Sequence, residues 1–352
     1  MTVTETSPGA RRTDLLLAQA RGIVDALLRR SFQQLPPAMR LVCGYQLGWW
    51  EADGRPASGA SGKALRPALA LAAAEAAGGH RSAAVPAGAV AELVHNFSLL
   101  HDDVLDRDET RRHRATAWKV YGTADAILAG DAMLALASQL LATGEYGFER
   151  HPRALGEALR RMGRCVTELC EAQHLDCEFE TRTDVELAEC LGMAEGKTGA
   201  LLGLSCALGA LAAGAPDGVV RAMDAFGRRL GMVFQLTDDL LGIWGDPAVT
   251  GKPVGADLLV RKKSLPVVAA LHEPGPAGRE LRARYASAEP LDQAGLTRTT
   301  ELVELAGGRA WAVEQARHYT VSALALLDHG LPATADTAAL RDLAASIAGR
   351  TL

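Results

Sequence analysis

Two aspartate-rich runs, each inside an apolar stretch, contain the residues best suited to chemistry in this chain. The first run contains Asp102, Asp103 and Asp106, and the second contains Asp238 and Asp239. A helix turns about 100° per residue, so Asp102 and Asp106 lie almost above one another. Neighbouring carboxylates on an apolar segment repel each other and lose hydration, so they require a cation. Mg²⁺ favours one or two carboxylates plus substrate phosphates, so facing runs predict a site for Mg²⁺ and a diphosphate.

Cationic and polar side chains near the two runs fit the same site. Lys63 and Arg66 stand at an expected loop-to-helix junction, where backbone N–H groups also favour anions. Taken alone, each such residue has an ordinary structural explanation, such as a solvated charge or a buried core histidine. Together with two aspartate runs they indicate a functional site. The set comprises Lys63, Arg66, His95, Arg111, Arg112, Lys197, Thr198, Gln235, Lys252 and Lys262.

Helices must position these residues, because Ala and Leu dominate the chain and strand-forming residues are scarce. We expect one all-α domain over residues 15–352, after a disordered tail at residues 1–14. Residues 51–62 predict a loop, residues 272–290 a surface excursion, and the glycines around Lys197-Thr198 a helix break. The expected helices cover residues 21–30, 67–77, 87–106, 123–142, 152–179, 184–194, 197–213, 217–244 and 300–328.

Charge and composition exclude several classes of protein. With a formal net charge of −5, the chain lacks the basic footprint of a nucleic-acid-binding protein. Its six cysteines show neither a CxxC pair nor zinc-finger spacing, which is typical of buried or incidental thiols in a reducing compartment. The N-terminus has no signal-peptide pattern, and the apolar stretch 199–216 is too short to span a bilayer. We therefore expect a cytoplasmic protein without a transmembrane helix.

Found together and in this order, the motifs resemble those of the trans-isoprenyl diphosphate synthase (polyprenyl synthetase) family, over roughly residues 35–330. The matching motifs are DDxxD at 102–106 with the trailing Arg111-Arg112, GKxxRP at 62–67, Lys197-Thr198, and Phe234-Gln235 before Asp238-Asp239. The resemblance implies a single-domain isoprenoid synthase helical bundle with a central cavity for diphosphate and Mg²⁺. It also implies condensation of isopentenyl diphosphate with an allylic diphosphate to a trans-polyprenyl diphosphate, through an allylic carbocation.

The resemblance further implies a role for each matching residue. Asp102, Asp106 and Asp238 would bind Mg²⁺, about three ions per substrate-bound site, with Asp103 and Asp239 in support. Arg111, Lys197, Lys252 and Lys262 would hold the allylic diphosphate. Lys63, Arg66, His95 and Arg112 would hold the diphosphate of isopentenyl diphosphate. The Lys197 carbonyl, the Thr198 hydroxyl and the Gln235 amide would stabilise the carbocation, and Gln173 and Asp176 match the family's mid-chain Gln-x-x-Asp.

Two positions depart from the family pattern. The second aspartate motif ends in Gly242 where the family usually has Asp, and Ala115 replaces a common Pro in the loop after the first motif. The first aspartate of the second motif is the usual metal ligand, so Asp238 should suffice. We expect Gly242→Asp to change the rate by well under about a hundredfold. We expect Ala115 to alter the loop and leave the chemistry unchanged.

Product length is expected to depend on Phe97 and Ser98, which precede Asp102 by five and four positions. An aromatic beside a small residue here resembles geranylgeranyl diphosphate synthases of the archaeal type and implies a C20 product, with C15 next. Helical geometry turns Ser98 and Leu99 toward the aspartate face but turns Phe97 away from it.

Two other functions stay open at this point. A class I terpene cyclase shares the fold, although its usual Asn-led second metal motif is missing because Asn96 is the only Asn. A non-catalytic subunit of a heteromeric prenyl synthase typically loses the first aspartates, which are present here. The family implies a homodimer. The sequence around the first motif also resembles polyprenyl transferases carried as cargo in encapsulin shells, with residues 1–14 as a candidate docking segment.

Overall fold

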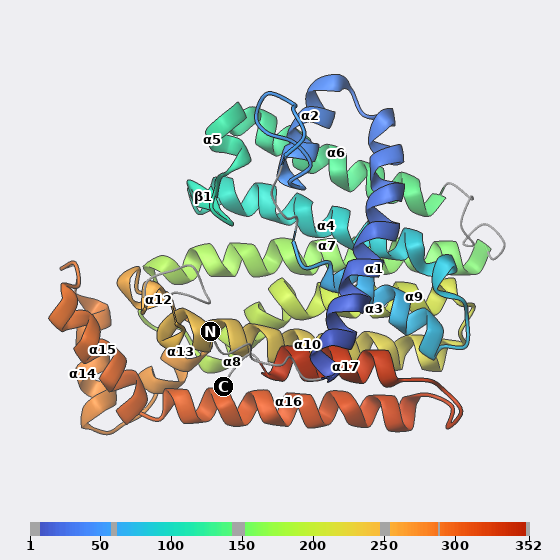
Figure 1. The fold of residues 1–352 in the computed structure, drawn as a ribbon. Coiled ribbons are helices and arrows are strands. Elements are labelled where there is room, and N and C mark those ends of the chain that lie inside the picture. Colours follow the sequence, from blue (N-terminus) through green and yellow to red (C-terminus); the bar gives the residue numbers. More distant parts are fainter. Residues whose placement is uncertain (1–7, 58–61, 143–151, 247–253, 288, 350–352) are drawn as a thin grey trace, which may run out of the picture.

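The computed structural model describes residues 8–57, 62–142, 152–246, 254–287 and 289–349, and the fold is a helical bundle with one short hairpin (Figure 1). The expected all-α class is therefore confirmed. The hairpin pairs β1 (Thr110–Arg111) with β2 (Arg114–Ala115). The helices are α1 (Pro8–Ser31), α2 (Pro37–Gln46), α3 (Leu65–Ala76), α4 (Val85–Leu105), α5 (Ala117–Tyr121), α6 (Thr123–Ala142), α7 (Pro152–Thr181), α8 (Leu187–Ala194), α9 (Ala200–Ala212), α10 (Asp217–Trp244), α12 (Ala256–Leu259), α13 (Leu265–Leu271), α14 (Pro276–Ala286), α15 (Gln293–Leu305), α16 (Gly308–Gly330) and α17 (Ala338–Ala348).

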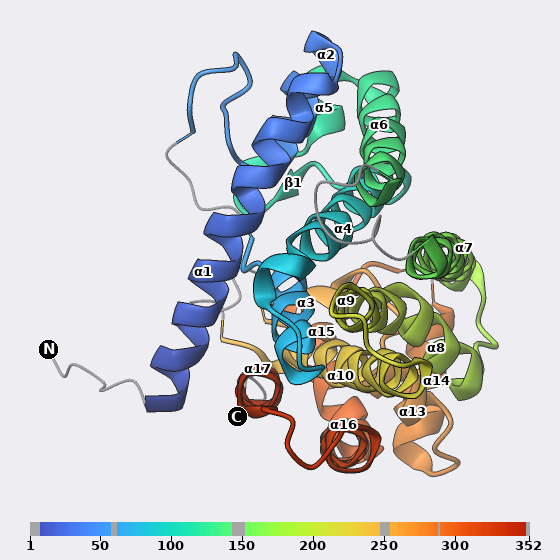
Figure 2. The ribbon, with the colours of Figure 1, turned by 90° about the vertical axis from the view of Figure 1, so that its right-hand side faces the viewer.

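Helix α9 lies at the centre of the bundle, and every residue in it except the last is buried. It packs against α3, α7 and α10, and α10 packs in turn against α16. Figure 2 views α7, α9, α10 and α16 nearly end-on and shows α1 crossing the outside of α3 and α4. Helices α2, α5 and α6 cover the far part of α4. The first aspartate run therefore ends a helix that is enclosed on several sides.

Glycines bring the backbones of α9 and α10 into direct contact. A Cβ atom at Gly227 would overlap the carbonyl group of Leu202, and one at Gly231 would overlap Gly199. Close backbone approach of this kind leaves little room for the two helices to slide, because packed interiors do not deform continuously. The turn that carries Lys197 is thereby fixed relative to the helix that carries the second aspartate run.

The expected tail is wrong for residues 8–14, which form the first turns of α1. Arg12 Nε lies 3.1 Å from Asp342 Oδ2 of α17, and the buried Thr13 hydroxyl donates to the Gly9 carbonyl at 3.1 Å. Contact with α17 orders this segment, and local composition cannot predict a contact with so distant a part of the chain. Residues 1–7 lie outside the described part of the chain.

One other element prediction is wrong and one is refined. The described residues of the expected surface excursion at 272–290 are mostly exposed, and they include the helix α14, in which Pro276 occupies the first turn, where its missing N–H costs nothing. The single helix expected at 300–328 is instead α15 and α16, separated at Gly307 by a left-handed backbone with φ of 77°. By contrast, α6 and α10 have the predicted bounds, 123–142 and 217–244.

Two segments are long and apolar enough to cross a membrane, judged by length and composition alone. They are Arg81–Leu105 and Thr123–Ala142, whose most apolar windows are 72% and 44% buried inside the fold. Core helices of soluble proteins have the same properties, so the two segments are weak evidence for a span. Because less of the second window is buried, an apolar face of α6 is exposed on the surface.

Candidate active site

The first aspartate run lies at the C-terminal end of α4, which Arg107 terminates with a left-handed backbone at φ of 56°. Asp103 is buried, and its Oδ1 atom accepts from the Arg111 guanidinium at 2.7 Å. The pKa of Asp102 is raised to about 6 by burial and by Asp106, although Lys197 lowers it. The negative end of the helix dipole adds to this unfavourable charge. A bound cation would relieve it.

A π turn, Glu195–Gly199, carries Lys197 toward these aspartates. Lys197 Nζ lies 2.5 Å from Asp176 Oδ2 on α7, and its charge lowers the pKa of both Asp102 and Asp106. Gln173, one helical turn before Asp176, donates from Nε2 to Asp106 Oδ1 at 3.0 Å. The helical backbone thus continues through the predicted break as a π turn, and π turns of this kind are frequent at functional sites.

Thr198 begins a chain of hydrogen bonds that crosses to the second aspartate run. Its hydroxyl donates to Gln235 Oε1 at 2.7 Å, and Gln235 Nε2 donates to Asp239 Oδ1 at 2.7 Å. The other oxygen of Asp239 accepts from the backbone N–H of Leu265 at 2.9 Å. Asp239 is buried, which raises its pKa to about 7. Both of its oxygens are thus engaged in orienting Gln235 and in holding the start of α13.

Lys262 supplies the positive charge beside the second run. Burial lowers its pKa, but Asp239, Asp257, Asp176 and Asp238 together raise it above the ordinary value. Asp176 therefore acts electrostatically on the lysine of each aspartate run, Lys197 and Lys262. The fourth expected ligand of the allylic diphosphate, at position 252, lies outside the described residues.

A second cationic cluster surrounds the half-buried carboxylate of Glu92 on α4. Burial raises the pKa of Glu92, while Arg66 and Arg112 lower it. The pKa of His95 is lowered well below its ordinary value by burial and by the same two arginines, so this imidazole is neutral. Arg66 Nε is buried without a hydrogen-bond partner among the described residues. A buried guanidinium with an unused donor is suited to an anionic ligand. The expected Lys63 lies exposed in the adjoining loop.

The sequence analysis missed three residues of this cluster: Arg21, Asp25 and Glu92. Arg21 and Asp25 of α1 line a water-sized cavity of about 20 Å³ together with Glu92 and Arg112. Arg21 also donates from Nη2 to the carbonyl of Gly62. The only local indication was a charged pair four residues apart on α1, which is typical of any solvated helix face.

Three loops at the site contain non-glycine residues in the left-handed region. They are Ala64 before α3, Arg112 and His113 in the hairpin, and Arg261 before Lys262, with φ between 49° and 62°. L-residues adopt this conformation at a cost of about 1 kcal/mol or more each, so the surrounding contacts must enforce it. The anion-binding loops are therefore set in shape by the fold.

Replacing Gly62 by Ala is expected to weaken the binding of an anionic substrate at this cluster about tenfold. A Cβ atom at this position would lie 2.7–3.0 Å from the Arg112 guanidinium, which must then move. A misplaced charge-assisted hydrogen bond costs about 1.5 kcal/mol, which corresponds to that factor. Steady-state kinetics with each substrate varied in turn would check it. Gly9→Ala, on α1 where no atom lies within 4 Å of the new Cβ, is the control.

An apolar pocket of about 380 Å³ opens between α4 and α7 directly beneath Asp102. Phe97 and Ser98 both line it, and the Phe97 ring stacks edge-on against His101 at 4.9 Å between centroids. Phe97 therefore lines the same pocket as Asp102, although the helix turns the two side chains to different faces. The pocket extends around α4, so residues on two faces of this helix line it. Its other lining residues are Leu105, Leu169, Cys170, Gln173, His174 and Cys177.

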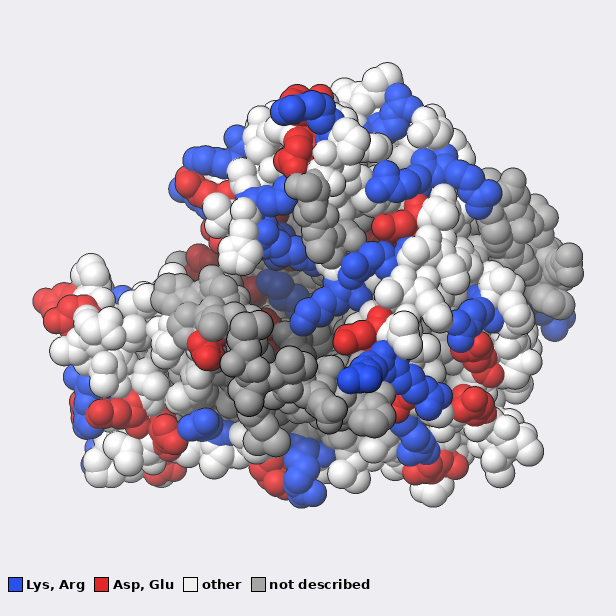
Figure 3. All heavy atoms as spheres, in the orientation of Figure 1, with Lys and Arg blue, Asp and Glu red and all other residues white. Residues whose placement is uncertain are grey.

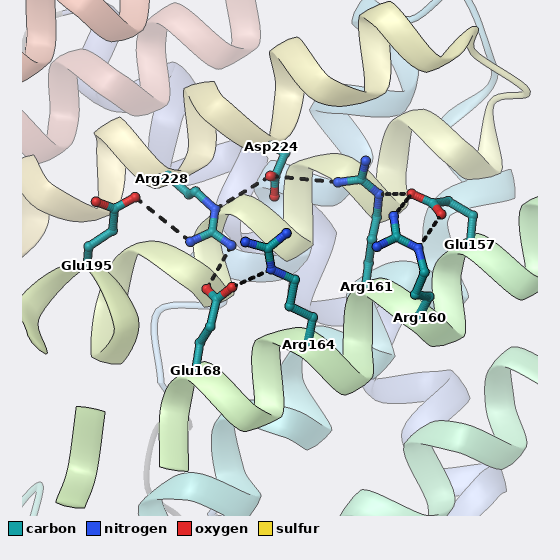
Figure 4. Close-up of polar contacts among 8 residues, drawn as sticks. All are labelled: Glu157, Arg160, Arg161, Arg164, Glu168, Glu195, Asp224 and Arg228. Carbon is teal, nitrogen blue, oxygen red and sulfur yellow. Dashed lines mark hydrogen bonds and ion pairs between the residues drawn. The ribbon is translucent and has the colours of Figure 1, made fainter. Parts of the chain in front are cut away.

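Ion pairs on the outer side of the π turn connect α7 to α10 (Figure 4). Arg228 of α10 lies 2.8 Å from Glu168 of α7, 3.5 Å from Asp224 and 3.9 Å from Glu195, the first residue of the turn. Arg161 extends the same network from α7 toward Asp224. The network supports the turn from the side opposite to the Lys197–Asp176 contact.

Positive charge also gathers on the molecular surface. Lys and Arg side chains gather along the hollow between the part that carries α2 and α5 and the part that carries α10 and α16 (Figure 3). Since the chain as a whole is acidic, this concentration of positive charge is local.

Comparison with known proteins agrees with this geometry. Residues 55–303 match the family model described as polyprenyl synthetase. The chain is 46% identical to the (2E,6E)-farnesyl diphosphate synthase of Mycobacterium tuberculosis, over 97% of this chain and 94% of that protein. It is 47% identical to a geranylgeranyl diphosphate synthase of the same organism, over 83% of this chain and 82% of that protein.

A solved structure is similar over almost the whole chain. The polyprenyl synthetase from Streptomyces coelicolor A3(2) superimposes with a TM-score of 0.87 at 41% identity, covering 95% of this chain and 98% of that one. The family match spans more than half of the chain, and the relatives match it at nearly full length. This protein is therefore a prenyltransferase that belongs to the polyprenyl synthetase family.

Proposed function

We propose that this enzyme condenses isopentenyl diphosphate with an allylic diphosphate and that its product is geranylgeranyl diphosphate. The observation that carries the reaction is the presence of two separate clusters of cationic side chains, each suited to a diphosphate. One combines aspartates with Lys197 and Lys262, and the other combines Arg66 and Arg112 without an aspartate run. A class I terpene cyclase would not require the second site, and a non-catalytic subunit would not require an intact first aspartate run.

The carboxylates of Asp102, Asp106 and Asp238 fit Mg²⁺, which enzymes of this family generally use. Among the described residues no group of three His, Cys, Asp or Glu side chains could hold a metal alone. This fits an ion that completes its shell with diphosphate oxygens and water. We propose about three ions per substrate-bound site. When bound, Mg²⁺ would neutralise the departing diphosphate as a Lewis acid.

The chain's own residues orient the substrates and shield the reaction. Lys197 and Lys262 hold the allylic diphosphate while its C1–O bond breaks and the bonding electrons leave with diphosphate. The Thr198 hydroxyl and the Gln235 amide, fixed by Asp239, present dipoles to the allylic cation. The double bond of isopentenyl diphosphate then forms the new C–C bond with C1, and released diphosphate accepts the proton that is lost.

A product assay tests the proposed reaction. The purified protein would receive Mg²⁺, isopentenyl diphosphate and, in turn, dimethylallyl, geranyl or farnesyl diphosphate, with products identified by mass spectrometry. A C20 diphosphate is the expected result. A C15 diphosphate would retain the reaction and overturn the length. Hydrocarbon formed from farnesyl diphosphate alone would overturn the reaction in favour of a cyclase.

Phe97→Ala is expected to lengthen the main product by at least one isoprene unit. Removing the ring empties space along the 380 Å³ pocket beneath Asp102, so a longer chain fits. The measurement is the product distribution of the variant at fixed substrate ratio. Leu105→Ala, at the exposed rim of the same pocket, is the control and should change the distribution little. An unchanged product from Phe97→Ala would contradict the proposed role.

We also propose that the cytoplasmic enzyme is a homodimer joined through α6. Leu128 and Ile127 on this helix are 53% and 38% exposed, and only 44% of its apolar window is buried. Light scattering should give twice the mass of one chain for the wild type, and Leu128→Glu should shift it toward one. Docking to an encapsulin-type shell remains a proposal, now resting on residues 1–7, because residues 8–14 belong to α1.

A further inference from the structure

Arginine side chains line a cavity of about 260 Å³ between α7, α9 and α10, on the outer side of the π turn. They are Arg160, Arg161, Arg164, Arg221 and Arg228. None of the lining residues belongs to either cationic cluster of the active site. Asp224 is the only carboxylate among the described residues that line the cavity, so its lining is basic although the chain as a whole is acidic.

Two of these arginines share one glutamate near the start of α7 (Figure 4). Arg160 and Arg161 lie 2.6 and 2.7 Å from the same oxygen, Oε1, of Glu157. Arg161 also lies 3.7 Å from Asp224, and its side chain is only 16% exposed. A guanidinium carries five N–H donors and one positive charge, so two of them on one carboxylate retain unused donors and a net positive charge.

The same arrangement recurs at Glu168, on the other side of the cavity. Its two oxygens lie 2.7 Å from Arg164 and 2.8 Å from Arg228. Arg221 is exposed and forms no ion pair with a carboxylate among the described residues. Like charges around one cavity repel each other, and an anion inside it would relieve this repulsion.

The size and lining of the cavity indicate a small anion. Sites for drug-sized ligands measure about 300–1,000 Å³, and this cavity is smaller. Its buried apolar lining consists of Cys165, Ala200 and Leu204, which is too little to cover a prenyl chain. Planar guanidinium groups bind phosphate oxygens in pairs. Inorganic diphosphate, which is compact and multiply charged, therefore fits better than a prenyl diphosphate.

Arg228 connects the cavity to the π turn. Its guanidinium lies 3.9 Å from Glu195, the residue that begins the turn carrying Lys197 and Thr198. A Cβ atom at Gly203 would lie 2.8 Å from Arg228 Cγ, so the stem of Arg228 packs closely against α9 and mainly its guanidinium is able to move. An anion that draws this guanidinium into the cavity would weaken its contact with Glu195 and loosen the turn.

We propose that this arginine cavity binds inorganic diphosphate outside the active site, and that its occupancy slows prenyl transfer through Arg228 and the π turn. The regulatory part of the inference rests on the proposed function, in which each turnover releases diphosphate. The binding part does not depend on it. Diphosphate that accumulates would then lower the rate without competing with the allylic substrate.

Calorimetric titration with inorganic diphosphate tests the binding site. Mg²⁺ is left out, because the aspartate runs require a cation to bind this anion. Combining Arg160→Gln, Arg164→Gln and Arg221→Gln removes three exposed charges and should weaken binding about tenfold or more. Arg317→Gln, in an exposed ion pair on α16, is the control and should bind as the wild type does. The ligand-free Tm of each variant checks that the fold is retained.

Two further titrations separate this site from others. Arg66→Gln, in the active-site cluster, should leave the binding event in place, and its loss there but not in the combined variant would overturn the inference. Farnesyl diphosphate should bind to the cavity more weakly than inorganic diphosphate. Tighter binding of farnesyl diphosphate that the combined variant abolishes would overturn the choice of the free anion.

Inhibition by added diphosphate tests the effect on the rate. At saturating allylic substrate and constant free Mg²⁺, diphosphate should lower the kcat of the wild type. The combined variant should need about tenfold more diphosphate for the same loss, relative to its own rate without diphosphate. Equal inhibition of the two proteins, or inhibition that saturating allylic substrate abolishes, would overturn the regulatory role. Absence of prenyl transfer in the wild type would instead overturn the proposed function, while calorimetry would still decide on the binding site.

Discussion

Asp102→Asn is expected to lower kcat about 10²–10³-fold, which corresponds to about 3–4 kcal/mol of transition-state stabilisation. Asparagine preserves the shape of the side chain but cannot provide the charge that holds Mg²⁺ against the leaving diphosphate. Steady-state rates at saturating substrates and Mg²⁺ measure the effect. Glu314→Gln, in an exposed ion pair on α16, is the control and should leave kcat unchanged.

The same variant should be more stable than the wild type without ligand. The folded-state pKa of Asp102 is raised from 3.8 to about 6, so its carboxyl group stabilises the fold most below pH 3.8. That stabilisation is lost as the pH rises through about 6. At pH 8 the ionised carboxylate therefore destabilises the ligand-free fold. Asn removes this charge, so the ligand-free Tm of the variant should rise. A reduced Tm with a matching loss of kcat would indicate damage to the fold instead.

Arg66→Gln is expected to raise the KM for isopentenyl diphosphate about 100-fold and to change the KM for the allylic substrate little. Arg66 is half-buried, and its buried Nε donor has no hydrogen-bond partner among the described residues. Truncating a buried, hydrogen-bonded charge costs about 2–5 kcal/mol, which covers this factor. Initial rates with one substrate varied at saturating amounts of the other separate the two KM values.

A second variant separates binding from folding at this position. Arg66→Gln alone leaves Glu92 with one cation fewer, so part of its effect could come from a destabilised fold. Arg66→Gln combined with Glu92→Gln should recover Tm and leave KM high. Recovery of KM in the double variant would show that Arg66 serves only to neutralise Glu92.

Local sequence patterns predicted some elements well and others not at all. Helices α6 and α10 have the predicted bounds because their apolar periodicity is continuous between residues that favour helix ends. The start of α1 was missed because it depends on Arg12 contacting Asp342, far away in the sequence. The division between α15 and α16 depends on one left-handed glycine, Gly307, whose conformation composition does not dictate.

The same contrast between local sequence patterns and long-range contacts applies to the residues of the site. Residues in dense motifs, such as Asp102 and Lys197, were predictable because their types and spacing are unusual on apolar segments. Glu92 and Arg21 have ordinary spacing, and only the packing of α1 against α4 brings them together at one cavity.

The left-handed residues Ala64, Arg112 and Arg261 affect when the cost of ordering their loops is incurred, on folding or on substrate binding. A flexible loop must be ordered each time a substrate binds, and this entropy loss weakens every binding event. In this protein the unfavourable conformations are imposed once, when the chain folds. Substituting Gly at such a position would ease folding and transfer the ordering cost to each encounter with substrate. The chain thus has a lower folding stability than its core would allow, in exchange for diphosphate sites that are ready before their ligands arrive.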